Sequence, residues 1–382
     1  MAIDEKGPES AKEKRLRERN NPQRKYMLYT NMSLRRYAPI IILQLCILSG
    51  EPAEAKVPAL IVFGDSTVDT GNNNYISTVV RSDFAPYGRD LRLGNGQPTG
   101  RFSNGRLTVD FISEAFGLPP LVPPYLDPSA NMSSLAAGAC FASAGAGYDN
   151  ATSDLLSVLT IWKQLDYFKE YAAKLRSFQG EEKAQETLTE ALYLVSMGTN
   201  DFLENYYAVP HGNAAKYPTA AAYGGYLLGA AESFVRALHA LGARKVDLNG
   251  MPPMGCLPME RALGGACTEE YNAVAEEYNV GLRAVIGRLN GELSGARIVY
   301  GDVYGPVSDA LGHPGSYGLE NVEAGCCGAT GRFEMGYLCN ARSPLTCADA
   351  GKFAFWDAIH ATERLHHALA DAKMNTTLHV FL

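Results

Sequence analysis

The sequence predicts an α/β protein in which helices cover both faces of a parallel sheet. Short apolar runs of strand length alternate with amphipathic stretches of helix length along the chain, which is the pattern of such sheets. The chain has 382 residues, of which 46% are hydrophobic and 20% charged, so its composition is that of a globular protein with a large core. Because no internal repeat, heptad run or low-complexity linker interrupts the pattern, we expect one domain after an N-terminal leader.

Five apolar runs have the length of buried strands. Gly64, Gly198 and Gly301 stand directly after three of these runs and end the strand. The predicted strands cover residues 59–63, 136–142, 191–197, 243–248 and 296–300.

Five stretches have the length and apolar periodicity of helices. Gly117 and Pro119 end the first of them, and Thr268 suits the start of the fourth as an N-cap. The segments 118–128, which is rich in proline, and 313–351, which is rich in glycine and cysteine, are expected to be irregular. The predicted helices cover residues 107–116, 161–177, 218–240, 268–293 and 363 to about 371.

The charge distribution argues against nucleic acid as a partner. The formal net charge is −7, and no cluster of Lys and Arg follows residue 55. Proteins that bind nucleic acid need clustered basic side chains for their phosphate contacts.

Residues 1–55 have the features of a leader that ends in a secretory signal peptide. A basic segment at 33–37 precedes an apolar run at 39–48, and Ala53-Glu54-Ala55 has the small-x-small pattern of a cleavage site. The apolar run is shorter than the ~20 residues of a membrane span. We therefore expect cleavage after Ala55 and a single mature domain at 56–382 with no membrane span. The alternative is an uncleaved signal anchor.

The charged stretch from Met1 to Asn31 is unusually long for such a leader. Either Met32 is the working start of translation, or the extra residues are tolerated upstream of the apolar run. Asn-x-Ser/Thr triplets in the mature chain agree with secretion, although such triplets also occur by chance. The candidate glycosylation sites are Asn131, Asn150 and Asn375.

The cysteines after the leader fit an oxidising compartment. Cys140 stands alone in an apolar stretch, where a free cysteine is usually a small buried hydrophobe. The others are close enough in sequence to bridge locally, and their spacing lacks the paired C-x-x-C pattern of a zinc site. The disulfide candidates are Cys256, Cys267, Cys326, Cys327, Cys339 and Cys347.

Three polar or glycine-rich loops follow the first three predicted strands. They contain Gly64-Asp65-Ser66, Gly145-Ala146-Gly147 and Gly198-Thr199-Asn200-Asp201. The carboxyl ends of parallel strands meet at one edge of the sheet, where α/β enzymes hold their chemistry. Ser66 supplies a hydroxyl there. The N–H groups of Ser66 and Gly145, with the Asn200 amide, could bind a developing oxyanion.

Asp357 and His360 are three residues apart near the C-terminus. At this spacing the carboxylate can accept a hydrogen bond from Nδ1–H of the histidine, which leaves Nε2 free to take a proton from the Ser66 hydroxyl. The alternative is a carboxylate at a helix start beside a solvated histidine.

The other features also have purely structural interpretations. Ser66 or Thr67 could cap a helix, and Asn200 could be a turn residue. Gly145 and Gly147 could be present only because the backbone has a positive φ there, which glycine adopts easily. Gly147 is also an alternative to Gly145 as a donor. The chain has no G-x-G-x-x-G before a helix and no G-x-S-x-G, which argues against a dinucleotide site and an α/β-hydrolase nucleophile elbow.

Four sequence blocks, in order, resemble the plant GDSL esterase/lipase family of the SGNH hydrolase superfamily. The resemblance extends from about Val57 to His367, and connecting stretches such as 100–106 and 252–258 match as well. The four blocks are Phe63-Gly64-Asp65-Ser66 followed by Asp69-Thr70-Gly71-Asn72-Asn73-Asn74, then 141–147, 198–202 and 355–360.

The resemblance implies a three-layer α/β/α fold with a central, mostly parallel five-stranded sheet, as in SGNH and flavodoxin-like proteins. It implies Ser66 as the nucleophile, His360 as the base and Asp357 as the residue that orients His360. The N–H groups of Ser66 and Gly145 and the side chain of Asn200 would form the oxyanion hole. Such enzymes need no metal and no organic cofactor.

Three positions depart from the family pattern. Thr67 stands where the name motif has Leu, and Cys140 stands where relatives usually have Asn. Ala361 replaces a proline that would stiffen the loop carrying the base, so we expect His360 to be held less firmly. None of the three removes a catalytic group.

Together these features predict a secreted serine hydrolase of the apoplast or cell wall that cleaves carboxylic or lipid-like esters through an acyl-enzyme. Its partners are expected to be small-molecule or lipid esters, and the protein is expected to be a monomer. The alternatives are an acyltransferase with an alcohol acceptor and a catalytically lapsed secreted glycoprotein that only binds esters or wall polymers.

Overall fold

The computed structural model describes residues 57–209, 213–261, 265–328, 339 and 345–382. The expected signal peptide, the start at Met32 and the cleavage site after Ala55 lie outside these residues and stay predictions.

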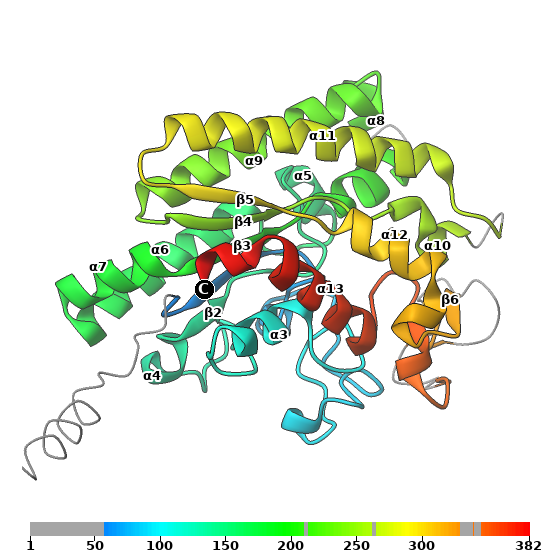
Figure 1. Cartoon of the computed structure of the whole chain (residues 1–382), viewed down its shortest axis with the longest axis horizontal. Helices are drawn as coiled ribbons and strands as arrows, with labels where there is room; N and C mark the ends of the chain where they lie inside the picture. The colour runs from blue at the N-terminus through cyan, green and yellow to red at the C-terminus, as the bar shows by residue number, and fades with distance from the viewer. Residues whose placement is uncertain (1–56, 210–212, 262–264, 329–338, 340–344) are drawn as a thin grey trace, which may run out of the picture. The chain divides into compact units, whose positions relative to one another are not determined.

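The five predicted strands form one sheet with the order β2-β1-β3-β4-β5, and every neighbouring pair is parallel (Figure 1). Parallel neighbours need long crossover connections, which the helices between the strands supply. The predicted α/β class with a parallel five-stranded sheet is therefore confirmed. The strands are β1 (Leu60–Gly64), β2 (Gly138–Cys140), β3 (Leu192–Ser196), β4 (Lys245–Asn249) and β5 (Arg297–Gly301).

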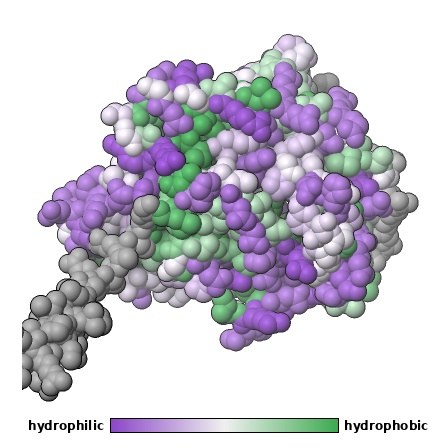
Figure 2. Space-filling model, in the orientation of Figure 1, coloured by the Kyte–Doolittle hydropathy of each residue, from purple (hydrophilic) through white to green (hydrophobic). Residues whose placement is uncertain are grey.

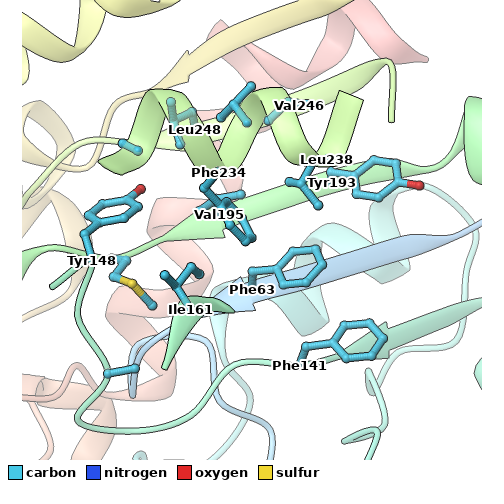
Figure 3. Packing of buried hydrophobic residues seen from close by; sticks show 14 of the residues in the cluster. Phe63, Phe141, Tyr148, Ile161, Tyr193, Val195, Phe234, Leu238, Val246 and Leu248 are labelled. Carbon is cyan, nitrogen blue, oxygen red and sulfur yellow. The ribbon is translucent and has the colours of Figure 1, made fainter. Parts of the chain in front are cut away.

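One face of the sheet packs against three long helices. Phe63 of β1 points to this face, and its ring centroid lies 5.3 Å from those of both Phe141 and Phe234. Figure 3 shows these rings among the buried side chains between the strands and the helical layer. The three helices are α6 (Ile161–Gln179), α9 (Ala220–Ala240) and α11 (Glu269–Glu292).

The opposite face packs against α3 (Thr108–Ala115) and α13 (Glu363–Thr376). Leu60 and Val62, which alternate with the residues that face the first layer, are fully buried here. Successive side chains of a strand point to opposite faces, so β1 is apolar throughout because both of its faces are covered.

Threonine caps begin several of these helices. Thr160, Thr219 and Thr362 each accept a hydrogen bond from a backbone N–H of the following turn. Thr268 stands before α11 as predicted, but its hydroxyl donates to the carbonyl oxygen of Glu260 at 3.4 Å and does not cap the helix.

The segment 313–351 is more regular than predicted. Within it, β6 (Asn321–Gly325) pairs in parallel with β7 (Phe353–Phe355) in a second, two-stranded sheet. The prediction was wrong because β6 is short and half-polar, so its sequence lacks an apolar run. Helices that the sequence analysis did not predict are α4 (Met132–Leu135), α5 (Asn150–Leu155), α7 (Glu181–Glu190), α8 (Asn213–Lys216), α10 (Pro258–Arg261), α12 (Tyr304–Gly312) and the π-helix η3 (Asp201–Tyr207).

Three disulfides join all six candidate cysteines. They link Cys256 to Cys267, Cys326 to Cys347 and Cys327 to Cys339. Cys140 is free and buried, as predicted, and burial raises the pKa of its thiol to about 12.

A buried ion pair fixes the loop 100–106 to α3. Arg101 forms two hydrogen bonds of 2.8 Å with the carboxylate of Asp110, and both side chains are almost completely buried. Asp110 also accepts from the N–H groups of Leu107 and Val122, so its charge is fully engaged.

The surface in Figure 2 is mostly hydrophilic, with hydrophobic patches between the hydrophilic residues. Asn131, Asn150 and Asn375 are exposed, and their glycosylation stays a prediction. Within the part of the chain that the structure describes, no helix has the length and apolar character needed to cross a bilayer.

Candidate active site

Asp357 and His360 form a hydrogen-bonded pair in the loop after β7. His360 Nδ1 lies 2.8 Å from Oδ2 and 2.9 Å from Oδ1 of Asp357. Thr362, and not Asp357, caps the helix that follows, so the interpretation of Asp357 as a helix-start carboxylate is wrong. With Nδ1 held by the carboxylate, Nε2 is the ring nitrogen available for proton transfer.

The surroundings of Asp357 favour its ionised form. Burial by itself raises the pKa of this carboxyl, but the charge of His360 and hydrogen bonds from His360 and from the N–H of Ile359 lower it. The net effect is a pKa below the ordinary value. The carboxylate is therefore charged at neutral pH and can stabilise a protonated His360.

Tyr87 is a further partner of Asp357 that the sequence analysis missed. Its hydroxyl donates to Asp357 Oδ2 at 2.7 Å. No local pattern could reveal this contact, because the two residues are 270 positions apart. Phe102 packs against the His360 ring, with a centroid distance of 4.9 Å.

Backbone hydrogen bonds hold the loop that carries His360. Trp356 N–H donates to the His360 carbonyl at 2.7 Å, and Thr362 N–H donates to Ala354 O at 2.9 Å. The Ser103 hydroxyl donates to the Ala361 carbonyl at 2.9 Å. These contacts restrain the loop although Ala361 stands in place of the proline that the family pattern has.

Ser66 lies in a tight turn directly after β1 and is 7% exposed. The Asp65 side chain accepts from the N–H of Thr67 at 2.9 Å and from its hydroxyl at 2.7 Å, and no helix begins here. The alternative that Ser66 or Thr67 caps a helix is therefore wrong.

The turn of Ser66 and the loop of His360 lie close together. Asp65 and Thr67, the two neighbours of Ser66, line the same cavity as His360. Burial raises the pKa of Asp65, and the charge of His360 is among the groups that partly offset this rise. The fold thus brings together two segments that are far apart in the sequence.

Two of the three candidate oxyanion donors, Gly145 and Asn200, lie in the loops after the strands that flank β1. Asn200 Nδ2 donates to the carbonyl of Ala146 at 3.0 Å, which joins the loop after β3 to the loop after β2. The second hydrogen of this amide is left for another acceptor.

The backbone distinguishes Gly145 from Gly147. Gly147 N–H donates to Ser153 Oγ at 3.2 Å, so it is already engaged. Among the described residues, no acceptor faces the N–H of Gly145 or the N–H of Ser66. Gly145 has a φ of 84°, a left-handed conformation that glycine adopts without strain.

Comparison with known proteins shows the family of this chain. The family model of GDSL-like Lipase/Acylhydrolase matches residues 60–372. The chain belongs to the GDSL lipase/acylhydrolase family. It is 53% identical to GDSL esterase/lipase At2g04570 of Arabidopsis thaliana over 331 residues, which are 86% of this chain and 93% of the relative. GDSL esterase/lipase At4g26790 of the same plant is 51% identical over 331 residues, with the same coverage.

Membership identifies the protein as a hydrolase of carboxylic esters. Three of the four sequence blocks lead into the loops after β1, β2 and β3, and the fourth leads into the loop after β7 of the second sheet. In this GDSL hydrolase, no group of three or more His, Cys, Asp and Glu side chains within the described residues is placed to hold a metal ion.

Asp201 is a second residue of the GDSL site whose role the sequence did not reveal. Its buried carboxylate accepts from the N–H groups of Tyr148 at 2.8 Å and Asp149 at 3.1 Å and from the Thr152 hydroxyl at 2.6 Å. Burial raises its pKa to about 7, an effect that these hydrogen bonds partly offset. A Cβ on Gly147 would lie 2.3 Å from this carboxylate, so the close approach requires glycine.

Asp69 and the asparagines after it hold the first GDSL block in place through hydrogen bonds. Asp69 accepts from the N–H groups of Gly71 and Asn72 at 2.8 Å and of Ala144 at 3.0 Å. Asn73 donates to the Ala144 carbonyl at 3.0 Å. The loop after β1 is thereby held against the loop after β2.

Proposed function

We propose that this GDSL hydrolase cleaves carboxylic esters through an acyl-enzyme intermediate on Ser66. The observation that carries the proposal is that His360, which is hydrogen-bonded to Asp357, lines the same cavity as the two neighbours of Ser66. A serine hydroxyl needs such a base to become a nucleophile, and the base needs a partner that fixes its tautomer.

In the first step, His360 Nε2 takes the proton of the Ser66 hydroxyl while Ser66 Oγ attacks the ester carbonyl. The N–H groups of Ser66 and Gly145 and the Asn200 amide stabilise the negative charge that develops on the carbonyl oxygen. The C–O bond of the ester then breaks, and protonated His360 gives its proton to the leaving alcohol.

In the second step, His360 takes a proton from a water molecule that attacks the acyl-enzyme. The same donors stabilise the second tetrahedral intermediate. Collapse of this intermediate breaks the bond to Ser66 Oγ, and His360 returns the proton to the serine. An alcohol in place of water would give acyl transfer, which is the main alternative for this site.

The proposal places the protein outside the cell, in the apoplast or cell wall, as a monomer. Three disulfides support an oxidising compartment, because such bonds are rare in the cytosol. A catalytically lapsed glycoprotein is the third alternative. It is disfavoured because Ser66, Asn200, Asp357 and His360 are all present and His360 is hydrogen-bonded to Asp357.

The test is hydrolysis of p-nitrophenyl esters by the Ser66→Ala variant. We expect loss of activity with an unchanged thermal unfolding temperature, and mass spectrometry of the wild type after rapid quenching should find the acyl group on Ser66. Ser129→Ala, at an exposed position, is the matched control. Wild-type rates in Ser66→Ala would refute the nucleophile. Products formed with added alcohols would separate transfer from hydrolysis.

A further inference from the structure

A cavity of about 100 Å³ extends inward from His360, between the sheet and the helices α12 and α13. Its walls are mostly apolar, with side chains such as Leu194, Val307, Leu365 and Leu369. Thr67 and Ser196 also line it, and their hydroxyl groups lie 3.0 Å apart and bond to each other. The cavity therefore joins the candidate catalytic base to an enclosed, largely apolar space.

A second histidine, His366, lines this cavity and has no part in the proposed mechanism. It is 4% exposed, and its Nδ1 lies 2.9 Å from the hydroxyl of Thr108. Burial, and then the charge of His360, lowers the pKa of His366 to about 3, so the ring is neutral at physiological pH.

The other ring nitrogen of His366, Nε2, has no hydrogen-bond partner in the part of the chain that the structure describes. His366 is also one of the residues that line the cavity. A buried polar atom costs free energy unless it is hydrogen-bonded. Asn249 and Lys373 line the cavity as well, but the Lys373 ammonium is already paired with Asp247 at 2.8 Å. The arrangement therefore suits a ligand that brings a polar atom to His366 within a largely apolar space.

The hydrogen-bonding role of Nε2 depends on the tautomer. The Thr108 hydroxyl can donate to Nδ1 or to the His366 carbonyl, which lies 3.3 Å away. In the first case Nε2 carries the proton and donates, and in the second it accepts. A hydroxyl group on the ligand can serve either form, because it is both a donor and an acceptor.

The chemistry of the two steps indicates which part of an ester lies in the cavity. The alcohol leaves after the first step and water takes its place, so that side must remain open to solvent. The acyl group stays on Ser66 through both steps and suits the inward cavity. At roughly 30 Å³ for each water-sized group, about 100 Å³ holds three or four non-hydrogen atoms.

We propose that this cavity binds short acyl chains that carry a hydroxyl group, and that His366 Nε2 forms a hydrogen bond with this hydroxyl. The proposal rests on the acyl-enzyme route given above. It makes His366 a specificity-determining residue and leaves the catalytic steps to Ser66 and His360.

The test compares two p-nitrophenyl esters of equal size, the 3-hydroxybutanoate and the 3-methylbutanoate, which differ by a hydroxyl in place of a methyl group. The wild type should favour the hydroxylated ester in kcat/KM by about three- to tenfold, as expected for one hydrogen bond. His366→Leu should lose this preference, and His366→Gln should keep part of it. His367→Leu, at the exposed neighbouring position, should keep all of it.

Equal kcat/KM for the two esters in the wild type would overturn the proposal, as would an unchanged preference in a folded His366→Leu variant. Neither result contradicts the proposed function, which fails only if the Ser66→Ala variant keeps its activity.

If His366→Leu does not fold, a second pair of variants tests whether the acyl chain of the substrate lies in the cavity. Val307→Ala enlarges the cavity and should raise kcat/KM for the pentanoate relative to the butanoate by about fourfold, the effect of burying one further methylene. Val285→Ala, which is similarly buried in α11 but does not line the cavity, should leave this ratio unchanged. An unchanged ratio in Val307→Ala would place the acyl chain elsewhere and overturn the proposal.

Discussion

Replacement of Asn200 by alanine tests the oxyanion hole most directly. The side chain has two amide hydrogens, one of which is used by the Ala146 carbonyl at 3.0 Å. The substitution therefore removes the hydrogen bond to the oxyanion and the tie that holds the Gly145 loop beside it. Loss of a single oxyanion donor costs on the order of 10²–10³ in kcat, and the loosened loop places the expected loss at the upper end.

The division of this loss between kcat and KM is the informative measurement. An oxyanion donor acts on charge that develops only in the transition state, so kcat should fall while KM stays within about twofold. Steady-state rates with p-nitrophenyl butanoate at saturating and limiting concentrations measure both constants.

Asn205→Ala is the matched control. Asn205 is buried and lies five positions further along, but its amide donates to the Thr152 hydroxyl at 2.9 Å and to Tyr223 rather than to the Ala146 carbonyl. Its substitution should lower the thermal unfolding temperature with little change in kcat. A fall in kcat below about threefold for a folded Asn200→Ala variant would remove Asn200 from the oxyanion hole.

Three further predictions concern stability and pH. Arg101→Met leaves the buried Asp110 carboxylate without its charge partner and should lower the free energy of unfolding by about 3–5 kcal/mol. The double variant Arg101→Met with Asp110→Leu should recover most of this loss. Calorimetry that finds the single variant as stable as the wild type would refute the prediction. The folded-state pKa of Asp357 is depressed, so its contribution to stability is present above its ordinary pKa of about 4 and is lost as pH falls through the folded value. The unfolding free energy of Asp357→Asn should therefore depend less steeply on pH below about pH 4 than that of the wild type. At pH 7 the variant should have a much lower kcat. An unchanged slope of unfolding free energy against pH would contradict the depressed pKa of Asp357. Reduction of the Cys326–Cys347 disulfide should lower the free energy of unfolding by about 2–4 kcal/mol. It should also reduce activity, because Cys326 N–H donates to the Phe355 carbonyl beside the loop that carries His360. Full activity in the reduced protein would contradict this prediction.

Features that depend on neighbouring residues could be predicted from the sequence. The apolar runs, three of which have a glycine directly after them, located the five strands because strand formation and termination are local properties. The three-residue spacing of Asp357 and His360 predicted their hydrogen bond for the same reason. The order of the four GDSL blocks pointed to Ser66 and to the family before any contact was known.

Features that depend on distant residues were decided by the tertiary structure. The strand order places β2 and β3 on either side of β1, and only this order brings the loops of Gly145 and Asn200 to the turn of Ser66. Tyr87 on Asp357, Asp201 under the glycine loop and His366 beside the cavity have no sequence signature. Each is an ordinary residue whose role comes from burial against a partner far along the chain, and burial is a property of the packed fold.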